Sequence, residues 1–191
     1  MRLILASASP RRRDLLDAAG VAHVVDPVDV DERRQPDEPP DEYATRVARS
    51  KALAGQARHP ADIVLGADTI VVVDGDVLGK PGDDDDAVAM LTRLSGRAHD
   101  VVTGVALAWP GHDRTVVERT RVWFAPLTGD EIYRYVVTGE PRDKAGAYAI
   151  QGMASRFVQR IDGSYSNVVG LPVATVLQLL REAGCEPPGF C

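Results

Sequence analysis

Residues 63–78 read IVLGADTIVVVDGDVL, and this stretch decides the fold. Residues 63–73 are rich in β-branched and other apolar side chains, which favours a buried strand. The Asp74-Gly75 pair is typical of a tight hairpin turn, after which the chain returns through Val77 and Leu78. The sequence therefore predicts a central strand with a short partner.

Asp68 interrupts this apolar run, and a carboxylate costs free energy to bury. It is tolerated best where it binds a metal, faces a cleft or pairs with a cation. Asp68 is therefore a candidate for acid–base catalysis or metal binding. The alternative is an aspartate at a strand end that only accepts hydrogen bonds from the backbone, and the residues alone leave both interpretations open.

A strand-to-helix junction is predicted at the N-terminus. Residues 3–5 read as a short buried strand, and Ser9-Pro10 fits the N-cap and first position of a helix. Residues 7–12 place hydroxyl groups, backbone N–H groups and guanidinium groups at the positive end of that helix, a combination that binds phosphate. The alternative is a basic first turn that points into solvent. The candidate anion ligands are Ser7, Arg11 and Arg12.

The rest of the chain alternates between helical and strand patterns without a repeat or linker, so one domain over residues 1–191 is expected. Residues 26–40, rich in proline and acid, read as a long surface loop that covers a site or as a disordered connector. The acidic run 83–86 precedes apolar residues at helical spacing, which favours a helix cap over a metal cluster. Further expected elements are a helix capped by Asp41 that ends near Arg58, a helix that ends at Gly96, a hairpin of residues 101–109 and 115–124, a helix begun by the capping box Thr128 to Glu131, a strand over residues 156–161, and a helix begun by Pro172.

The composition limits the class of protein. The chain has 22 basic and 28 acidic residues and a net charge of −6, which argues against binding to long nucleic acid but leaves room for a small anionic ligand. The two cysteines, Cys185 and Cys191, form no disulfide or zinc pattern, as expected in a reducing cytosol. No apolar run approaches the length of a membrane span. We therefore expect a cytoplasmic protein with no membrane partner.

Two further patterns resemble known motifs only in part. Gly79-Lys80-Pro81 has glycine and lysine as in a phosphate-binding P-loop, but the glycine spacing is short by one residue and Pro81 replaces the Mg²⁺-binding hydroxyl residue. Lys80 can still reach a phosphate from the end of the hairpin. His99-Asp100 and His112-Asp113 each match half of a metal-dependent phosphohydrolase signature, and four scattered histidines cannot complete it.

Along nearly its whole length the chain resembles the Maf family of nucleotide pyrophosphatases. The segment from Ser7 to Arg12 matches the family pattern Ser-x-Ser-Pro-Arg-Arg, and the further matches follow in family order. They are Asp31-Glu32, Lys51-Ala52, Gly66 to Thr69, Gly79-Lys80-Pro81, Leu94-Ser95-Gly96, His99, Thr103-Gly104-Val105, Asp143 to Gly146, Tyr148 to Gly152, and Gly163 to Pro172.

The resemblance implies a hydrolase that cleaves between the α- and β-phosphates of a nucleoside triphosphate, with Mg²⁺ or Mn²⁺ as cofactor. Asp68 would be the general base or a metal-linked carboxylate, and Glu32 a further acidic contributor to the metal region. The division of roles between these two carboxylates stays open. The cations implied to neutralise the triphosphate and the leaving pyrophosphate are Arg11, Arg12, Lys51 and Lys80.

The resemblance also implies a substrate class. Arg11, Thr69 and Gln151 match the branch of the family that acts on dTTP and UTP. The Gln151 amide offers an acceptor and donors that suit the N3–H and carbonyl edge of uracil or thymine. Taken without the family pattern, Gln151 reads as an ordinary loop amide. Modified pyrimidine triphosphates are possible substrates too.

The fold implied by the resemblance is a mixed α/β (α+β) fold, similar to that of inosine triphosphatases. An elongated central mixed sheet would be flanked by helices, with two lobes around a cleft, and the protein would be a homodimer. The family was named for an effect on septum formation, so the roles to weigh are clearance of nucleotides and control of cell division. The alternative function is a non-catalytic, nucleotide-binding regulator of division.

Overall fold

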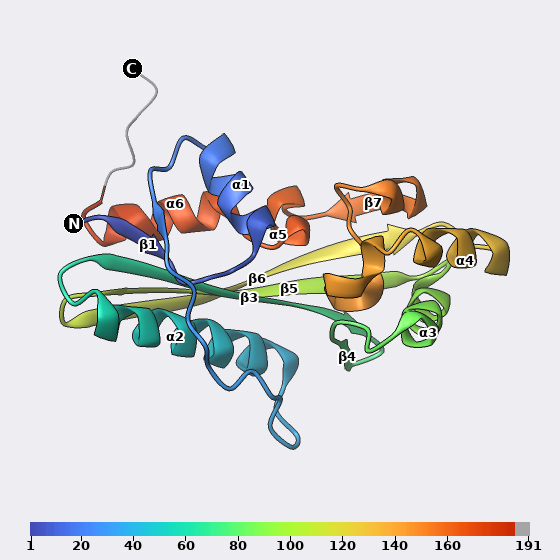
Figure 1. The fold of residues 1–191 in the computed structure, drawn as a ribbon, viewed down its shortest axis with the longest axis horizontal. Coiled ribbons are helices and arrows are strands. Elements are labelled where there is room, and N and C mark those ends of the chain that lie inside the picture. Colours follow the sequence, from blue (N-terminus) through green and yellow to red (C-terminus); the bar gives the residue numbers. More distant parts are fainter. Residues whose placement is uncertain (186–191) are drawn as a thin grey trace. The chain divides into compact units, whose positions relative to one another are not determined.

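The computed structural model describes residues 1–185, which form two compact units (Figure 1). The first unit contains Met1–Asp68, Thr103–Glu118 and the described residues from Gly170 onward. The second unit contains Thr69–Val102 and Arg119–Val169. None of the helices in residues 1–185 combines the length and the apolar character needed to cross a membrane.

The strands form a mixed sheet, as predicted. Within the described residues the hydrogen-bonded order is β2-β1-β3-β5-β6-β7, with β4 also paired to β3. β1 is parallel to both β2 and β3, whereas the pairs β3–β4 and β6–β7 are antiparallel. The strands are β1 (Leu3–Leu5), β2 (Val24–Val25), β3 (Ile63–Val73), β4 (Asp76–Leu78), β5 (Ala98–Trp109), β6 (His112–Phe124) and β7 (Val158–Asp162).

In the first unit, successive residues of the strands face opposite layers of helices, because side chains alternate along a strand. One face packs against α1 (Pro10–Ala18) and α6 (Val173–Glu182), and the other packs against α2 (Pro40–Arg58), as Figure 1 shows. The first face buries large side chains that include Leu5, Leu16, Ile63, Leu65, Leu107 and Leu180. The α2 face is lined by the small residues Ala48, Ala52, Ala106 and Ala108.

Glycines let α2 approach the strands closely. A Cβ atom on Gly66 of β3 would lie 2.2 Å from the Ala48 carbonyl oxygen and 2.6 Å from the Ala52 nitrogen. On Gly104 of β5 it would lie 2.2 Å from the Ala44 carbonyl oxygen. The backbone of α2 therefore rests directly on both strands, with no side chain between them at these two points.

The second unit contains the two helix caps that the sequence predicted, at Asp83 and at Thr128. Its longer helices are α3 (Asp84–Leu94) and α4 (Gly129–Val137). The Asp83 side chain accepts a hydrogen bond from the Asp86 nitrogen, so the acidic run caps α3 as predicted. Thr128 and Glu131 form the predicted capping box of α4. The shorter helical segments are η1 (Glu140–Asp143), η2 (Ala145–Ala147), η3 (Met153–Phe157) and α5 (Tyr165–Val169).

Some predicted boundaries are wrong. The N-cap of α2 is Pro39 rather than Asp41, because Pro40 fits the first helical position and Asp41 then lies inside the first turn. The strand predicted for residues 156–161 begins only at Val158, after the turns of η3. The sequence pattern also missed β2, whose two exposed valines carry no alternation.

Candidate functional site

The centre of the candidate site is the contact between Asp68 and Lys51 in the first unit. On β3, Val64, Gly66 and Asp68 alternate onto the face that α2 covers. Lys51 of α2 donates a hydrogen bond from Nζ to Asp68 Oδ1 at 2.9 Å, and both side chains are buried. Asp68 lies inside β3 and pairs with a cation, so the interpretation as a backbone-bonded aspartate at a strand end is wrong.

Glu32 joins the same cluster from the long loop before α2. Its Oε1 atom lies 2.8 Å from Lys51 Nζ, although the Glu32 side chain is 54% exposed. One ammonium group therefore holds two carboxylates, one buried and one open to solvent. Lys51 therefore compensates the cost of burying the Asp68 carboxylate in this part of the first unit.

Arg12 and Ser7 lie at the start of α1, where the sequence predicted an anion site. The Arg12 guanidinium group donates from Nη1 to Ser7 Oγ at 3.0 Å and from Nε to the Gly170 carbonyl oxygen at 2.8 Å. Burial lowers the pKa of Arg12, while the negative charges of Asp68 and Glu32 act in the opposite direction. Arg12 is buried rather than solvated, so the alternative of a basic turn in solvent is wrong for this residue.

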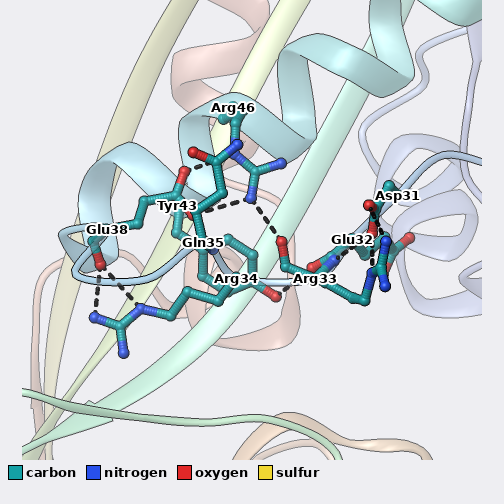
Figure 2. Close-up of polar contacts among 8 residues, drawn as sticks. All are labelled: Asp31, Glu32, Arg33, Arg34, Gln35, Glu38, Tyr43 and Arg46. Carbon is teal, nitrogen blue, oxygen red and sulfur yellow. Dashed lines mark hydrogen bonds and ion pairs between the residues drawn. The ribbon is translucent and has the colours of Figure 1, made fainter.

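The loop that carries Glu32 is fixed by hydrogen bonds to α2 (Figure 2). The buried Glu38 carboxylate accepts from Arg46 Nε at 2.6 Å and from Nη2 at 2.9 Å. Arg46 also donates to the Arg33 carbonyl oxygen at 2.9 Å, and Arg34 donates to the carbonyl oxygen of Glu38. Residues 31–38 thus form an ordered loop, and the interpretation as a disordered connector is wrong.

Tyr43 makes the most direct of these contacts with Glu32. Its hydroxyl group donates to the Glu32 carbonyl oxygen at 2.8 Å (Figure 2). Burial, followed by the charges of Asp68 and Glu32, raises the pKa of Tyr43, so the phenol remains a donor at neutral pH. Tyr43, Val47 and Lys51 are spaced four residues apart on α2. This spacing was the sequence signal that could have placed Tyr43 at the site.

Glu32 and Asp68 are the two carboxylates of this cluster that could hold a divalent cation. In residues 1–185 no group of three or more His, Cys, Asp or Glu side chains is arranged to hold a metal ion alone. Mg²⁺ commonly binds one or two carboxylates and completes its shell with water and substrate phosphates. Glu32 and Asp68, both within hydrogen-bonding distance of the Lys51 ammonium, form such a pair.

The other predicted site residues are distributed over both units. Arg11 is half-buried on α1 in the first unit. Thr69 follows Asp68 along β3 and is the first residue of the second unit. Lys80 is exposed after β4, and Gln151 is exposed in the loop that precedes η3. The residues that the structure brings together are Ser7 with Arg12, and Glu32 with Lys51 and Asp68.

Comparison with known proteins gives consistent matches. A family model described as "Maf-like protein" matches residues 2–183. A curated relative from Koribacter versatilis (strain Ellin345), named dTTP/UTP pyrophosphatase, is 53% identical over 96% of this chain and 95% of its own length. A relative of the same name from Anaeromyxobacter sp. (strain Fw109-5) is 55% identical over 98% of this chain and 92% of its own. Among solved structures, the Staphylococcus aureus Ham1 protein is similar with a TM-score of 0.48 and 13% identity, over 96% of this chain and 100% of that one.

Proposed function

Because the chain belongs to the Maf family, we propose that it is a nucleoside triphosphate pyrophosphatase that hydrolyses dTTP and UTP to the monophosphate and pyrophosphate. The observation that carries this proposal is the Glu32–Lys51–Asp68 cluster, which supplies a buried base and a second carboxylate in a chain similar to curated pyrophosphatases. The curated relatives that match nearly the whole chain are named as enzymes. The regulator alternative is therefore not favoured.

In the proposed reaction, Asp68 accepts a proton from the attacking water. Water adds to the α-phosphorus, the bond from that phosphorus to the α–β bridging oxygen breaks, and pyrophosphate leaves with the negative charge that builds on it. A bound divalent cation would polarise the phosphoryl oxygens. Lys51 orients both carboxylates. Arg11, Arg12 and Lys80 are proposed to balance the charge of the triphosphate, with Ser7 as a hydroxyl donor to a phosphate oxygen.

Gln151 is proposed to recognise the base. Thr69 and Arg11 are the other two residues proposed to favour dTTP and UTP over other nucleoside triphosphates. We propose further that the protein acts as one catalytic domain in the cytoplasm, forms a homodimer, and clears standard or modified pyrimidine triphosphates. Light scattering coupled to size-exclusion chromatography tests the dimer.

The substrate proposal predicts a clear preference within a nucleotide panel. Pyrophosphate release by the wild-type protein with Mg²⁺ or Mn²⁺ should be fastest for dTTP and UTP among dTTP, UTP, CTP, GTP, ATP and 7-methyl-GTP. A site built to hydrogen-bond one base edge leaves its polar groups unpaired with another base, so discrimination against CTP of about 100-fold or more is expected. Equal turnover of all six nucleotides would contradict base recognition. Binding of dTTP without any turnover would favour the regulator.

The ordered loop around Glu32 leads to a second prediction. Arg46→Ala removes the bonds to Glu38 and to the Arg33 carbonyl oxygen, and so loosens the segment that presents Glu32. Loss of a group that orients a metal ligand commonly costs about ten-fold or more in metal affinity. We therefore expect the Mg²⁺ concentration for half-maximal activity to rise about ten-fold, and Mn²⁺ binding measured by electron paramagnetic resonance to weaken in parallel.

The matched control for Arg46→Ala is Arg33→Ala in the same loop. The Arg33 side chain is largely exposed and bonds only to Asp31 among the contacts of Figure 2. Its removal should leave the Mg²⁺ requirement within about two-fold of wild type, because exposed ion pairs contribute little. Equal behaviour of the two variants would show that the Arg46 contacts do not serve Glu32.

A further inference from the structure

Gln151 lies in a tight loop of the second unit, between Tyr148 and the start of η3. The Gly152 nitrogen donates to the Ala149 carbonyl oxygen at 3.0 Å, which closes a turn with Gln151 inside it. The Gln151 side chain is exposed, and its neighbours Ile150 and Ala154 are buried. The backbone of the turn therefore determines where the amide is presented.

Two side chains from outside the loop bind its backbone on both sides of Gln151. The Tyr135 hydroxyl group of α4 accepts from the Ala149 nitrogen at 3.2 Å and donates to Glu140 Oε1 at 2.8 Å. The other carboxylate oxygen, Glu140 Oε2, accepts from the Met153 nitrogen at 3.1 Å. A continuous chain of hydrogen bonds thus links the residue two before Gln151 to the residue two after it.

The Tyr135 hydroxyl group is the donor of the hydrogen bond to Glu140. Burial, together with the hydrogen bond to Glu140, raises the pKa of Tyr135 above its ordinary value. The phenol therefore stays protonated across the physiological range and continues to donate to the carboxylate. Charge-assisted hydrogen bonds of this kind are stronger than bonds between neutral groups.

Gly152 shows how tightly the loop packs on the carboxylate. A Cβ atom on Gly152 would lie 2.4 to 2.5 Å from the three atoms of the Glu140 carboxylate group. Its φ of −105° is open to any residue, so the crowding at this position comes from the Glu140 carboxylate rather than from the backbone conformation. The carboxylate of Glu140 occupies the volume that a side chain at 152 would need.

We propose that Tyr135 and Glu140 are positioning residues for base recognition: they clamp the turn so that the Gln151 amide meets the pyrimidine edge in one orientation. This inference rests on the proposed function, because it assumes that Gln151 reads the base. An amide discriminates between bases only if its donor and acceptor are held in register with the base edge. Neither positioning residue is expected to touch the nucleotide.

The test compares kcat/KM for UTP with kcat/KM for CTP in Glu140→Gln and Tyr135→Phe. Glu140→Gln leaves one acceptor oxygen for two donors, and Tyr135→Phe removes the link to Ala149. We expect the UTP to CTP ratio to fall at least ten-fold in both variants, mainly through a higher KM for UTP. Tyr133→Phe is the matched control, because Tyr133 is exposed on the same helix. It should keep the wild-type ratio.

A double-variant comparison separates positioning from a general structural role. In a Gln151→Ala background the ratio is already low, and adding Glu140→Gln should not lower it further. An equal loss of activity on both nucleotides, or an unchanged ratio in a variant that folds, overturns the inference. Failure of the proposed function looks different: the wild type itself would show no turnover or no preference.

Discussion

Asp68→Asn is expected to lower kcat for dTTP and UTP by about 1,000-fold, while the protein stays folded and still binds nucleotide. Asparagine has the same shape and keeps an oxygen that can accept from Lys51, so the contact between β3 and α2 survives. It cannot take a proton from water, and loss of a positioned general base typically costs 10²- to 10⁴-fold. Because Asp68 is buried, bulk water has little access to this position and cannot easily replace the lost carboxylate as the base.

The measurement is pyrophosphate release at saturating UTP and Mg²⁺, with urea denaturation as the check on folding. Asp113→Asn is a suitable control, since Asp113 lies in the same unit, near the start of β6, and its carboxylate pairs with Arg49. That variant should retain wild-type kcat. If Asp68→Asn kept more than about a tenth of the wild-type kcat, the base would have to be another group, and Glu32 would be the next residue to replace.

The sequence predicted features that depend on neighbouring residues better than features that depend on distant ones. The caps at Asp83 and Thr128 are bonds between a side chain and the backbone three residues later, so local sequence was sufficient. The position of Glu32 could not be obtained in this way. It depends on bonds from Arg46 and Tyr43, which lie more than ten residues further along the chain.

The sequence pattern alone pointed to some site residues, the resemblance added the others, and the structure supplied the grouping. The pattern gave Ser7, Arg11, Arg12, Asp68 and Lys80, and the resemblance added Glu32, Lys51, Thr69 and Gln151. Alternation along β3 places Asp68 on the same face as Gly66, a regularity that the sequence contains. The contact between this face and Lys51 can be inferred only when it is known that α2 packs against β3. The clamp formed by Tyr135 and Glu140 lay outside the sequence prediction, because neither residue belongs to a pattern that distinguishes it from an ordinary helix and turn residue.

Gly66→Ala is expected to destabilise the protein strongly, with a loss of about 3 kcal/mol or more in the free energy of unfolding. The added Cβ would lie 2.2 Å from the Ala48 carbonyl oxygen and 2.6 Å from the Ala52 nitrogen. Both atoms belong to the backbone of α2, so no rotation of a side chain relieves the clash. Overpacking of a tight core commonly costs about 1–3 kcal/mol, and more where the neighbours cannot move.

The same substitution should also damage catalysis in whatever protein remains folded. Ala48 and Ala52 flank Lys51 on α2, and Gly66 lies two residues before Asp68 on the same face of β3. Pushing α2 away from β3 therefore lengthens the contact between Lys51 and Asp68, so kcat should fall together with stability. Urea denaturation and UTP turnover measure the two effects.

Gly129→Ala is the matched control, since a Cβ there meets nothing within 4 Å and alanine is the better helix former. If Gly66→Ala matched this control in both measurements, the close approach of α2 to β3 would be wrong, and with it the geometry that joins Lys51 to Asp68.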